Sequence, residues 1–275
     1  MKKMLAPLII VAIFLIGLSI LLYPVVSDII NSRTQTRVVA QYYKDLDNLD
    51  ESDYTKLLEA AYTYNKDLLT NNSRFKLSDE EKLEYFSMLD FTGIGVIGSL
   101  EIEAIKVNLP IYQDTTESVL QIGAGHLIGS SLPVGGVGTH SVITGHTGLP
   151  SSTLLTNLDK LVIGDIFSLQ VLKDKLIYEI DQIIVVAPED FSNLGIDIKE
   201  DYCTLLTCTP YGINSHRLLV RGCRIFPEES TVRADMESNS QDITGMVWML
   251  SIIIIILAAA LVKRRDIRHR RDLVI

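Results

Sequence analysis

Residues 204–222 read TLLTCTPYGINSHRLLVRG, and this stretch decides the fold. A β-type run ends at Cys208, turn-forming residues follow from Pro210 to Ser215, and a second β-type run begins at Arg217, which predicts a hairpin. Similar short runs, broken by Gly and Pro, begin after Gly93. They span residues 107–111, 141–144, 166–172, 176–186, 203–208 and 217–225. Many short strands within about 130 residues predict a mainly β barrel or sandwich.

Three residues in this region suit thiol acyl transfer. Cys208 precedes Arg217 by nine positions, and His146 lies upstream in the segment TGHTG, residues 144–148. A cysteine attacks a carbonyl as its thiolate, which a nearby imidazole or cation stabilises. A guanidinium can then neutralise the oxyanion of the tetrahedral intermediate. A free cysteine without such neighbours behaves as a small buried apolar residue, so the residues alone leave both interpretations of Cys208 open.

Two segments resemble a known family. Thr207–Gly222 resembles the active-site segment of the sortases, in particular the class C, pilin-polymerising branch, and Ser141–His146 resembles the histidine strand of that family. The similarity runs from about Ile102 to Phe226. It implies a mainly β fold, an eight-stranded sortase-type β-barrel. The rest of the sequence adds an expected N-terminal helical region and two flanking transmembrane helices, as described below.

The resemblance also implies a reaction, that of a cysteine transpeptidase. Cys208 would attack the Thr–Gly bond of an LPxTG-like sorting signal in a surface or pilin protein. His146 would protonate the departing amine, and Arg217 would support the substrate and the oxyanion. The thioester acyl-enzyme would then pass its acyl group to a lysine amine of a pilin. No cofactor or metal is implied, and no Cys/His spacing suggests a zinc site.

Two other functions stay open at this point. One is a wall-anchoring sortase that uses a peptidoglycan amine as its acceptor. The other is a non-catalytic barrel that binds sorting peptides without cleaving them.

Several residues compete for the roles of His146 and Arg217. His126, His140 and His216 are alternative acid/base candidates, whereas His269 lies beyond the second apolar run. The residues alone do not choose among these histidines; the resemblance selects His146 and leaves His126 as a loop residue with a structural role. Arg217 could equally be an ordinary strand-surface charge, as could Arg221 and Arg224.

Two apolar runs predict membrane spans. Leu5–Val26 and Met246–Val262 reach the length of about 17–25 residues that a bilayer core requires. Lys2 and Lys3 precede the first run and six Lys or Arg residues follow the second, so both ends are expected in the cytoplasm and the catalytic domain outside the cell membrane. The alternative for the first run is a cleaved signal, but the run is longer than a signal peptide and lacks an Ala-x-Ala site.

Charge follows the same division. The segment between the two spans holds 17 of the 25 basic and 32 of the 34 acidic residues, a net charge of −15, which excludes a nucleic-acid partner. The expected domains are a cytoplasmic N-terminus and anchor (1–26), an extracellular helical region (27–92), the barrel (93–229), a tether (230–245), a second transmembrane helix (246–262) and a basic cytoplasmic tail (263–275).

The helical region carries clear local signals. Apolar residues recur at helical spacing from Val38 to Leu69, and Ser78 with Glu81 forms a capping-box pattern before a helix expected to run through Leu89. Residues 93–98 match the dinucleotide fingerprint G-x-G-x-x-G, but β-type sequence follows where that motif requires a helix. We therefore expect no nucleotide site there.

Two features depart from the family pattern. Class C sortases often carry a lid with an Asp-Pro-aromatic motif, and no such tripeptide occurs between Ser27 and Gly93, which leaves self-inhibition open. The second departure is Cys203 with Cys223. If Cys208 faces Arg217, Cys203 falls opposite Gly222, one position from Cys223; a disulfide would then need a bulge, and the default is two free thiols.

Overall fold

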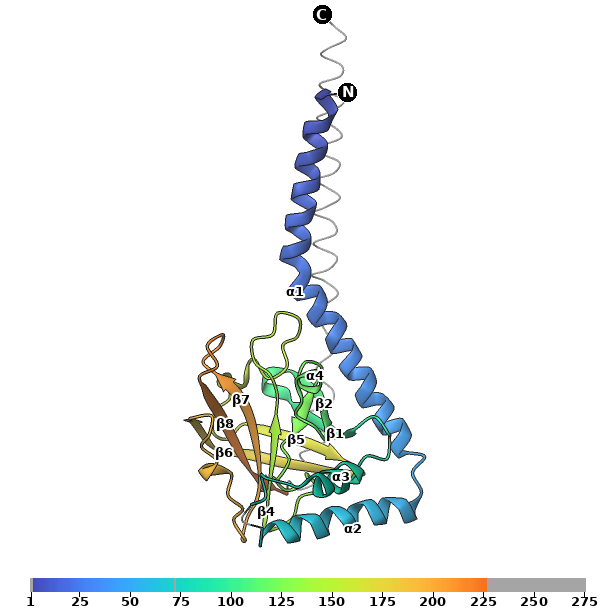
Figure 1. Cartoon of the computed structure of the whole chain (residues 1–275), viewed down its shortest axis with the longest axis vertical. Helices are drawn as coiled ribbons and strands as arrows, with labels where there is room; N and C mark the ends of the chain where they lie inside the picture. The colour runs from blue at the N-terminus through green and yellow to red at the C-terminus, as the bar shows by residue number, and fades with distance from the viewer. Residues whose placement is uncertain (1, 72, 227–275) are drawn as a thin grey trace, which may run out of the picture. The chain divides into compact units, whose positions relative to one another are not determined.

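A computed structural model describes residues 2–71 and 73–226, with side chains described from Val11 onward. Three helices precede a run of strands and short helical turns (Figure 1). The expected tether, second membrane span and basic tail lie outside the described residues. The elements are α1 (Lys2–Leu46), α2 (Glu51–Leu68), α3 (Asp79–Ser87), β1 (Val96–Ile102), η1 (Glu103–Ile105), β2 (Val107–Tyr112), α4 (Glu117–Leu120), β3 (Ala124–His126), β4 (Thr139–Thr144), η2 (Leu158–Lys160), β5 (Ile166–Val171), β6 (Asp174–Val186), η3 (Ser192–Leu194), β7 (Asp201–Thr209) and β8 (His216–Ile225).

The eight strands close into a barrel in the order β1-β2-β3-β4-β7-β8-β6-β5. Neighbours are antiparallel except for the β2/β3 and β4/β7 pairs, which are parallel. The expected mainly β, eight-stranded barrel is confirmed, and six of its strands coincide with the six β-type runs of the sequence. The sequence did not indicate β1 as a separate strand, and it missed β3.

The barrel interior is filled by alternate residues of the strands. Ile97, Leu100, Ile143, Leu205 and Val220 are fully buried members of one apolar cluster. Since successive side chains of a strand point to opposite faces, the residues between them face outward, toward solvent or covering segments. This alternation decides which polar residues of β7 and β8 are available for chemistry.

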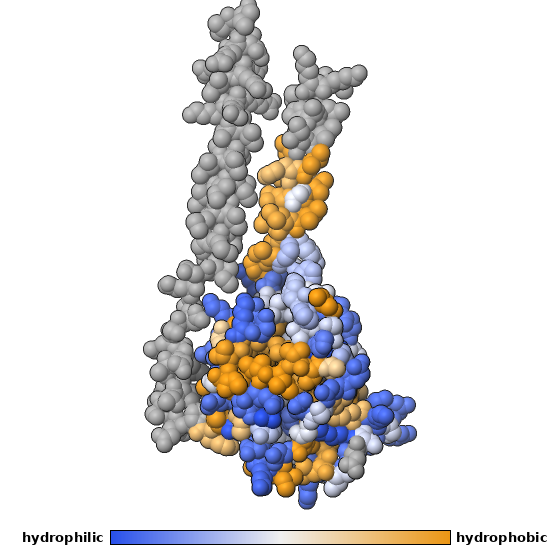
Figure 2. Space-filling view, turned by 90° about the vertical axis from the view of Figure 1, so that its left-hand side faces the viewer, coloured by the Kyte–Doolittle hydropathy of each residue, from blue (hydrophilic) through white to orange (hydrophobic). Residues whose placement is uncertain are grey.

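Helix α1 continues without interruption from the apolar N-terminal run into contact with the barrel. The described part has one candidate membrane span, Val11–Leu46, with a mean hydropathy of 2.2 in its most apolar window and none of that window buried. Figure 2 shows the described apolar part of α1 as an orange surface above the barrel. One apolar helix near the N-terminus is compatible with a membrane anchor.

The C-terminal half of α1 is fixed to the barrel by Tyr42. Its ring is buried in the apolar core, and its hydroxyl donates to the Ile97 carbonyl of β1 (3.1 Å) and accepts from the Leu172 N–H (2.8 Å). Burial raises the pKa of Tyr42 well above its usual value, which keeps the hydroxyl protonated and able to donate. α1 is therefore an integral part of the domain.

Helices α2 and α3 pack at the end of the barrel away from the apolar part of α1 (Figure 1). The capping box of α3 is confirmed: Glu81 N–H donates to Ser78 Oγ (3.2 Å), and Ser78 N–H donates to Glu81 (2.6 Å). The helix ends at Ser87, before the expected Leu89, which has a positive φ of 59°. Asn65 of α2 holds the Leu132 backbone by two hydrogen bonds, which joins the helices to the barrel.

The G-x-G-x-x-G segment has the context that the sequence indicated. Gly98 lies inside β1, against the backbone of Gln170 in β5, and a 3-10 turn and β2 follow this strand. The Asp90 carboxylate accepts from the N–H groups of Gly93 and Gly95, so it occupies the donors of the glycine turn. The segment is therefore a turn, closed by Asp90, that leads into the first strand of the barrel.

Replacing Tyr42 by Phe should lower the free energy of unfolding by about 1–3 kcal/mol, because the buried Leu172 N–H and Ile97 carbonyl each lose a partner. Chemical denaturation of the purified protein in detergent measures this change. Tyr43→Phe is the matched control: the side chain of Tyr43 is exposed and its hydroxyl makes one hydrogen bond, with Ser99 Oγ (3.0 Å), so the loss should be below about 1 kcal/mol. Equal losses for the two variants would contradict the anchoring role of Tyr42.

Candidate active site

Cys208 and Arg217 stand opposite each other on neighbouring strands. They are paired residues in the antiparallel β7/β8 register, as the hairpin pattern predicted, and the loop 210–215 joins the two strands. The Cys208 side chain is partly exposed. Side chains of directly paired residues lie within contact distance on one face of a sheet, so the thiol and the guanidinium share one surface.

His146 approaches Cys208 from the other side of β7. Strand β4 runs parallel to β7, with Thr144 paired to Leu206. The register continues beyond the strand, because Gly145 N–H donates to the Leu206 carbonyl (3.1 Å) and Thr207 Oγ1 donates to the Gly145 carbonyl (2.8 Å). If the same register is extended by one more residue, His146 lies beside Cys208. The structure thus brings all three predicted site residues to the ends of three adjacent strands.

The three residues stand on the outer face of the barrel. Leu206 and Leu219 share the face of Cys208 and Arg217 by strand alternation, and both belong to a separate apolar cluster outside the barrel core. Val142 of β4 and Ile184 of β6 belong to the same cluster. Val142 and Leu219 are buried within it, whereas Leu206 and Ile184 are half-buried, so Leu206 is the partly exposed apolar side chain two positions before the thiol.

The imidazole of His146 has an acidic partner that the sequence did not indicate. Its Nε2 lies 3.0 Å from Glu117 Oε2, at the start of the short helix α4, and the Glu117 side chain is largely exposed. Hydrogen bonds from Gln121 and His146 lower the pKa of the Glu117 carboxyl, which keeps it charged at neutral pH. No sequence signal marks an exposed glutamate 29 residues away, because only the fold brings it to the histidine.

The arginines of β8 differ in their contacts. Arg217 Nη1 donates to the backbone carbonyls of Asn214 (3.2 Å) and His216 (3.0 Å). Arg221, four residues along the same face, is held in a two-point ion pair with Asp181 (3.0 and 2.7 Å) and lies over the ring of Tyr202. Arg224 stacks near Phe226 at the far end of β8. Arg217 is thus the guanidinium that flanks the thiol.

The competing histidines occupy other surroundings. His126 lies in strand β3, so its expected place in a loop was wrong: three residues bounded by glycine are too few to form a recognisable strand pattern. It is fully buried and contacts Tyr85 Oη (2.6 Å) and the Ser131 carbonyl (2.8 Å), which agrees with a structural role. His140 is buried between Gly195 and Thr204, and His216 is exposed beside Ser215.

The three cysteines are free and face different environments. The register pairs Cys203 with Gly222 and Cys223 with Tyr202, as the one-residue offset predicted. Cys203 is buried in the barrel core, whereas Cys223 faces outward and donates to Glu200 (3.4 Å). Burial raises the pKa of both thiols, that of Cys223 to about 11, so neither is a reactive thiolate at neutral pH.

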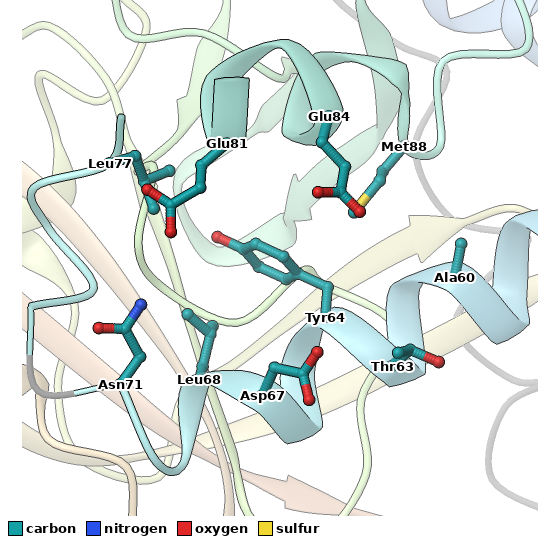
Figure 3. A pocket seen from close by; sticks show the side chains of 10 residues that line it. All are labelled: Ala60, Thr63, Tyr64, Asp67, Leu68, Asn71, Leu77, Glu81, Glu84 and Met88. Carbon is teal, nitrogen blue, oxygen red and sulfur yellow. The ribbon is translucent and has the colours of Figure 1, made fainter. Parts of the chain in front are cut away.

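Two hollows lie away from these residues. One, of about 390 Å³, lies between α2 and α3, where Asp67, Glu81 and Glu84 surround the Tyr64 ring (Figure 3). The other, of about 500 Å³, lies beside Arg224 and Asp201 near the start of β7. Neither hollow is lined by Cys208, His146 or Arg217. Within the described residues, no group of His, Cys, Asp or Glu side chains suits a metal ion.

Comparison with known proteins identifies the class to which this fold and site belong. The sortase domain model matches residues 100–225. The chain also covers 100% of the crystallised sortase C1 from Streptococcus agalactiae, which covers 70% of this chain, with 44% sequence identity and a TM-score of 0.68. The chain belongs to the sortase family.

Further solved structures that it resembles are also class C sortases. Sortase C from Streptococcus pneumoniae is 46% identical, covers 70% of this chain and is itself 97% covered, with a TM-score of 0.63. Sortase C from Clostridium perfringens is 39% identical, with coverages of 70% and 99% and a TM-score of 0.60. No curated protein matches the chain. Members of this family are cysteine transpeptidases.

The buried histidines predict an acid-sensitive fold. Burial lowers the pKa of His126 and of His140 to about 4, from an ordinary value near 6.5. Between these values the unfolded chain binds protons that the folded chain does not, so stability present above pH 6.5 is lost as the pH falls toward 4. The loss should be on the order of 2–3 kcal/mol for each histidine.

Urea denaturation at pH 7.5 and at pH 4.5 measures this loss. In a His140→Gln variant, which does not titrate, the free energy of unfolding should fall less between the two pH values than in the original protein. An equal fall in both proteins would assign the acid sensitivity to other groups.

Proposed function

We propose that the chain is a membrane-anchored cysteine transpeptidase that cleaves an LPxTG-like sorting signal between Thr and Gly and joins the acyl fragment to a lysine amine of a pilin. The observation that carries this proposal is the β4/β7/β8 register, which aligns His146, Cys208 and Arg217 on one outer face. Sortase C from Streptococcus pneumoniae, to which the chain is 46% identical, is described in terms of its pilin substrate specificity. A pilin substrate is therefore the first to test.

In the first half-reaction the Cys208 thiolate attacks the threonine carbonyl carbon. The new C–S bond converts the carbonyl oxygen to an oxyanion, which the guanidinium of Arg217 stabilises across the strand pair. The C–N bond then breaks, and His146 donates a proton to the departing glycine amine. A thioester on Cys208 remains. The half-buried Leu206, which lies on the same face as the thiol, would contact an apolar residue of the sorting signal.

In the second half-reaction a lysine amine attacks the thioester. His146 accepts the proton that the amine loses, and the Cys208 thiolate leaves, which restores the starting state. The amine must react faster than water, so the acceptor has to be held next to the thioester.

Helix α1 supports a location of the enzyme at the cell membrane. The exposed apolar surface of Val11–Val26 would lie in the bilayer, with the barrel on the outer side of the membrane. With its substrates outside the cell as well, the barrel and the sorting signals would share one compartment.

An acyl-enzyme trapping experiment tests the reaction. Incubation of the detergent-solubilised protein with a sorting-signal peptide should add the acyl fragment to Cys208, detected by intact-protein mass spectrometry. Cys208→Ala should form no adduct, and Cys223→Ala should form it at the original rate, because Cys223 is paired with Tyr202 at the other end of β7. Arg217→Ala should slow acylation by about 10²–10³-fold, the cost of removing one oxyanion donor. An original protein that binds the peptide but forms no adduct would favour a binding barrel.

The acceptor is tested by supplying the two amines separately. A pilin-derived lysine peptide should resolve the acyl-enzyme into an isopeptide product faster than a peptidoglycan stem-peptide amine does. The opposite preference would make the enzyme a wall-anchoring sortase, while cleavage by Cys208 would still stand.

Glu117 should act as a positioning residue for His146. Glu117→Ala removes the acceptor at Nε2 and should lower kcat for acylation by about two- to fivefold, because an exposed ion pair contributes little and the imidazole loses its fixed orientation. KM for the peptide should stay unchanged, since Glu117 is expected to orient the proton donor and not to bind the peptide. Gln121→Ala, which removes the other partner of Glu117, is the control and should leave both constants unchanged. An unchanged kcat for Glu117→Ala, or a change confined to KM, would exclude this role.

A further inference from the structure

The apolar run of α1 ends close to the active-site end of the barrel. Val26 is the last residue of that run, and the helix continues as Ser27 and Asp28 without a break. Asp28 Oδ1 accepts from the Thr153 N–H (2.6 Å), and Asn31 Nδ2 donates to the Ser151 carbonyl (2.7 Å). At 1.5 Å per residue, Asp28 lies only about 3 Å along the axis beyond Val26.

A third contact joins α1 to two segments next to His146: the loop that follows this histidine and the segment that follows α4. Gln35 is buried, and its Nε2 donates to the Ile122 carbonyl (3.2 Å) and to Ser152 Oγ (3.3 Å). Ile122 follows α4, which carries Glu117, and Ser152 belongs to the loop that follows His146. The barrel is thus fixed to α1 through its active-site loops, at the level where the helix leaves its apolar run.

Exposed apolar side chains surround the same end of the barrel. Tyr211 and Ile213, in the β7–β8 loop, are 68% and 72% exposed, and Ile122 is 49% exposed. Tyr211 lies against the loop after His146, because a Cβ on Gly148 would be only 3.1 Å from its Cε2. In Figure 1 the β7–β8 loop and the loop after β4 lie at the barrel end nearest the apolar part of α1. We call Ile122, Tyr211 and Ile213 the apolar rim.

We propose that the apolar rim rests on the lipid headgroup layer of the membrane that holds α1, so that the active site opens at the bilayer surface. The inference rests on the proposed anchoring by α1. Tyrosine is favoured at membrane interfaces because its ring is apolar and its hydroxyl is polar, and a neighbouring isoleucine adds apolar surface. A site held there suits a sorting signal in a protein that is itself bound to the membrane.

The opposite end of the barrel supplies matched controls. Ile198 is 69% exposed and Val137 is 75% exposed. The two residues are neighbours in space, because the Ile198 backbone lies close to Gly138, which follows Val137. Val137 precedes the first residue of β4, and Ile198 precedes the first residue of β7. Tyr211 and Ile213 follow the last residue of β7, so a full strand separates the two groups. Ile198 thus has the exposure of Ile213 without its place near α1.

Fluorescence quenching by lipids tests the proposal in the full chain. Trp248 is the single tryptophan, so a Trp248→Phe background receives one new tryptophan in place of Phe14, Ile213 or Ile198, and each variant is placed in phosphatidylcholine vesicles with brominated acyl chains near the headgroups. We expect loss of emission for Phe14→Trp and Ile213→Trp and unchanged emission for Ile198→Trp. Circular dichroism checks that each variant is folded.

The outcomes separate the two ideas. Quenching of Phe14→Trp with equal, unchanged emission for Ile213→Trp and Ile198→Trp would overturn the rim contact and keep the anchor. Unquenched Phe14→Trp would overturn the anchor and, with it, the rim contact. Adduct formation on Cys208 is measured independently, so neither result is confused with a failure of the transpeptidase chemistry.

Discussion

The backbone hydrogen bonds on the two sides of β7 determine where the three proposed catalytic residues lie. On one side a parallel register sets Thr144 beside Leu206 and leads His146 toward Cys208; on the other, an antiparallel register sets Arg217 beside the same cysteine. Because a shift of one residue would turn each side chain to the other face, both registers must hold for the three groups to meet. The apolar barrel core stabilises both registers, because Ile143, Leu205 and Val220 point into it from the same three strands.

Helix α1 adds a second constraint, on the histidine side of the site. Its polar residues hold the loop after His146 and the end of α4, while Tyr42 fixes its C-terminal half to β1. Cys208 and Arg217 are paired within one hairpin, whereas His146 lies two residues beyond the end of its strand. The placement of the imidazole therefore depends on a helix that is distant in sequence. In the described part of region 27–92, the hydrogen bonds near the site are made by Asp28, Asn31 and Gln35, and their partners are residues 122 and 151–153.

Local patterns were sufficient for much of the fold. The capping box at Ser78 and the hairpin between Cys208 and Arg217 depend on residues a few positions apart, and both were predicted correctly. Strand β3 was missed because three residues around Gly125 are too short a pattern, and β1 because Gly98 and the irregular register beside it interrupt the alternation of apolar residues. Helix α1 continues past Val26, where the anchor was expected to end, so the apolar run and the start of the following helical region form one helix. The contact of His146 with Glu117 joins residues 29 positions apart through the barrel, so no sequence pattern indicates it.

The positions of the three sulfur atoms have a consequence for the response of the protein to oxidants. Cys203 is enclosed by the core, and Cys223 is paired with Tyr202, six residues along β7 from Cys208, or about 20 Å. A sulfenic acid formed on Cys208 would therefore find no second thiol of its own chain within bonding distance. Repair would have to come from a small thiol or a reductase outside the protein, whereas a wrong internal disulfide would never form.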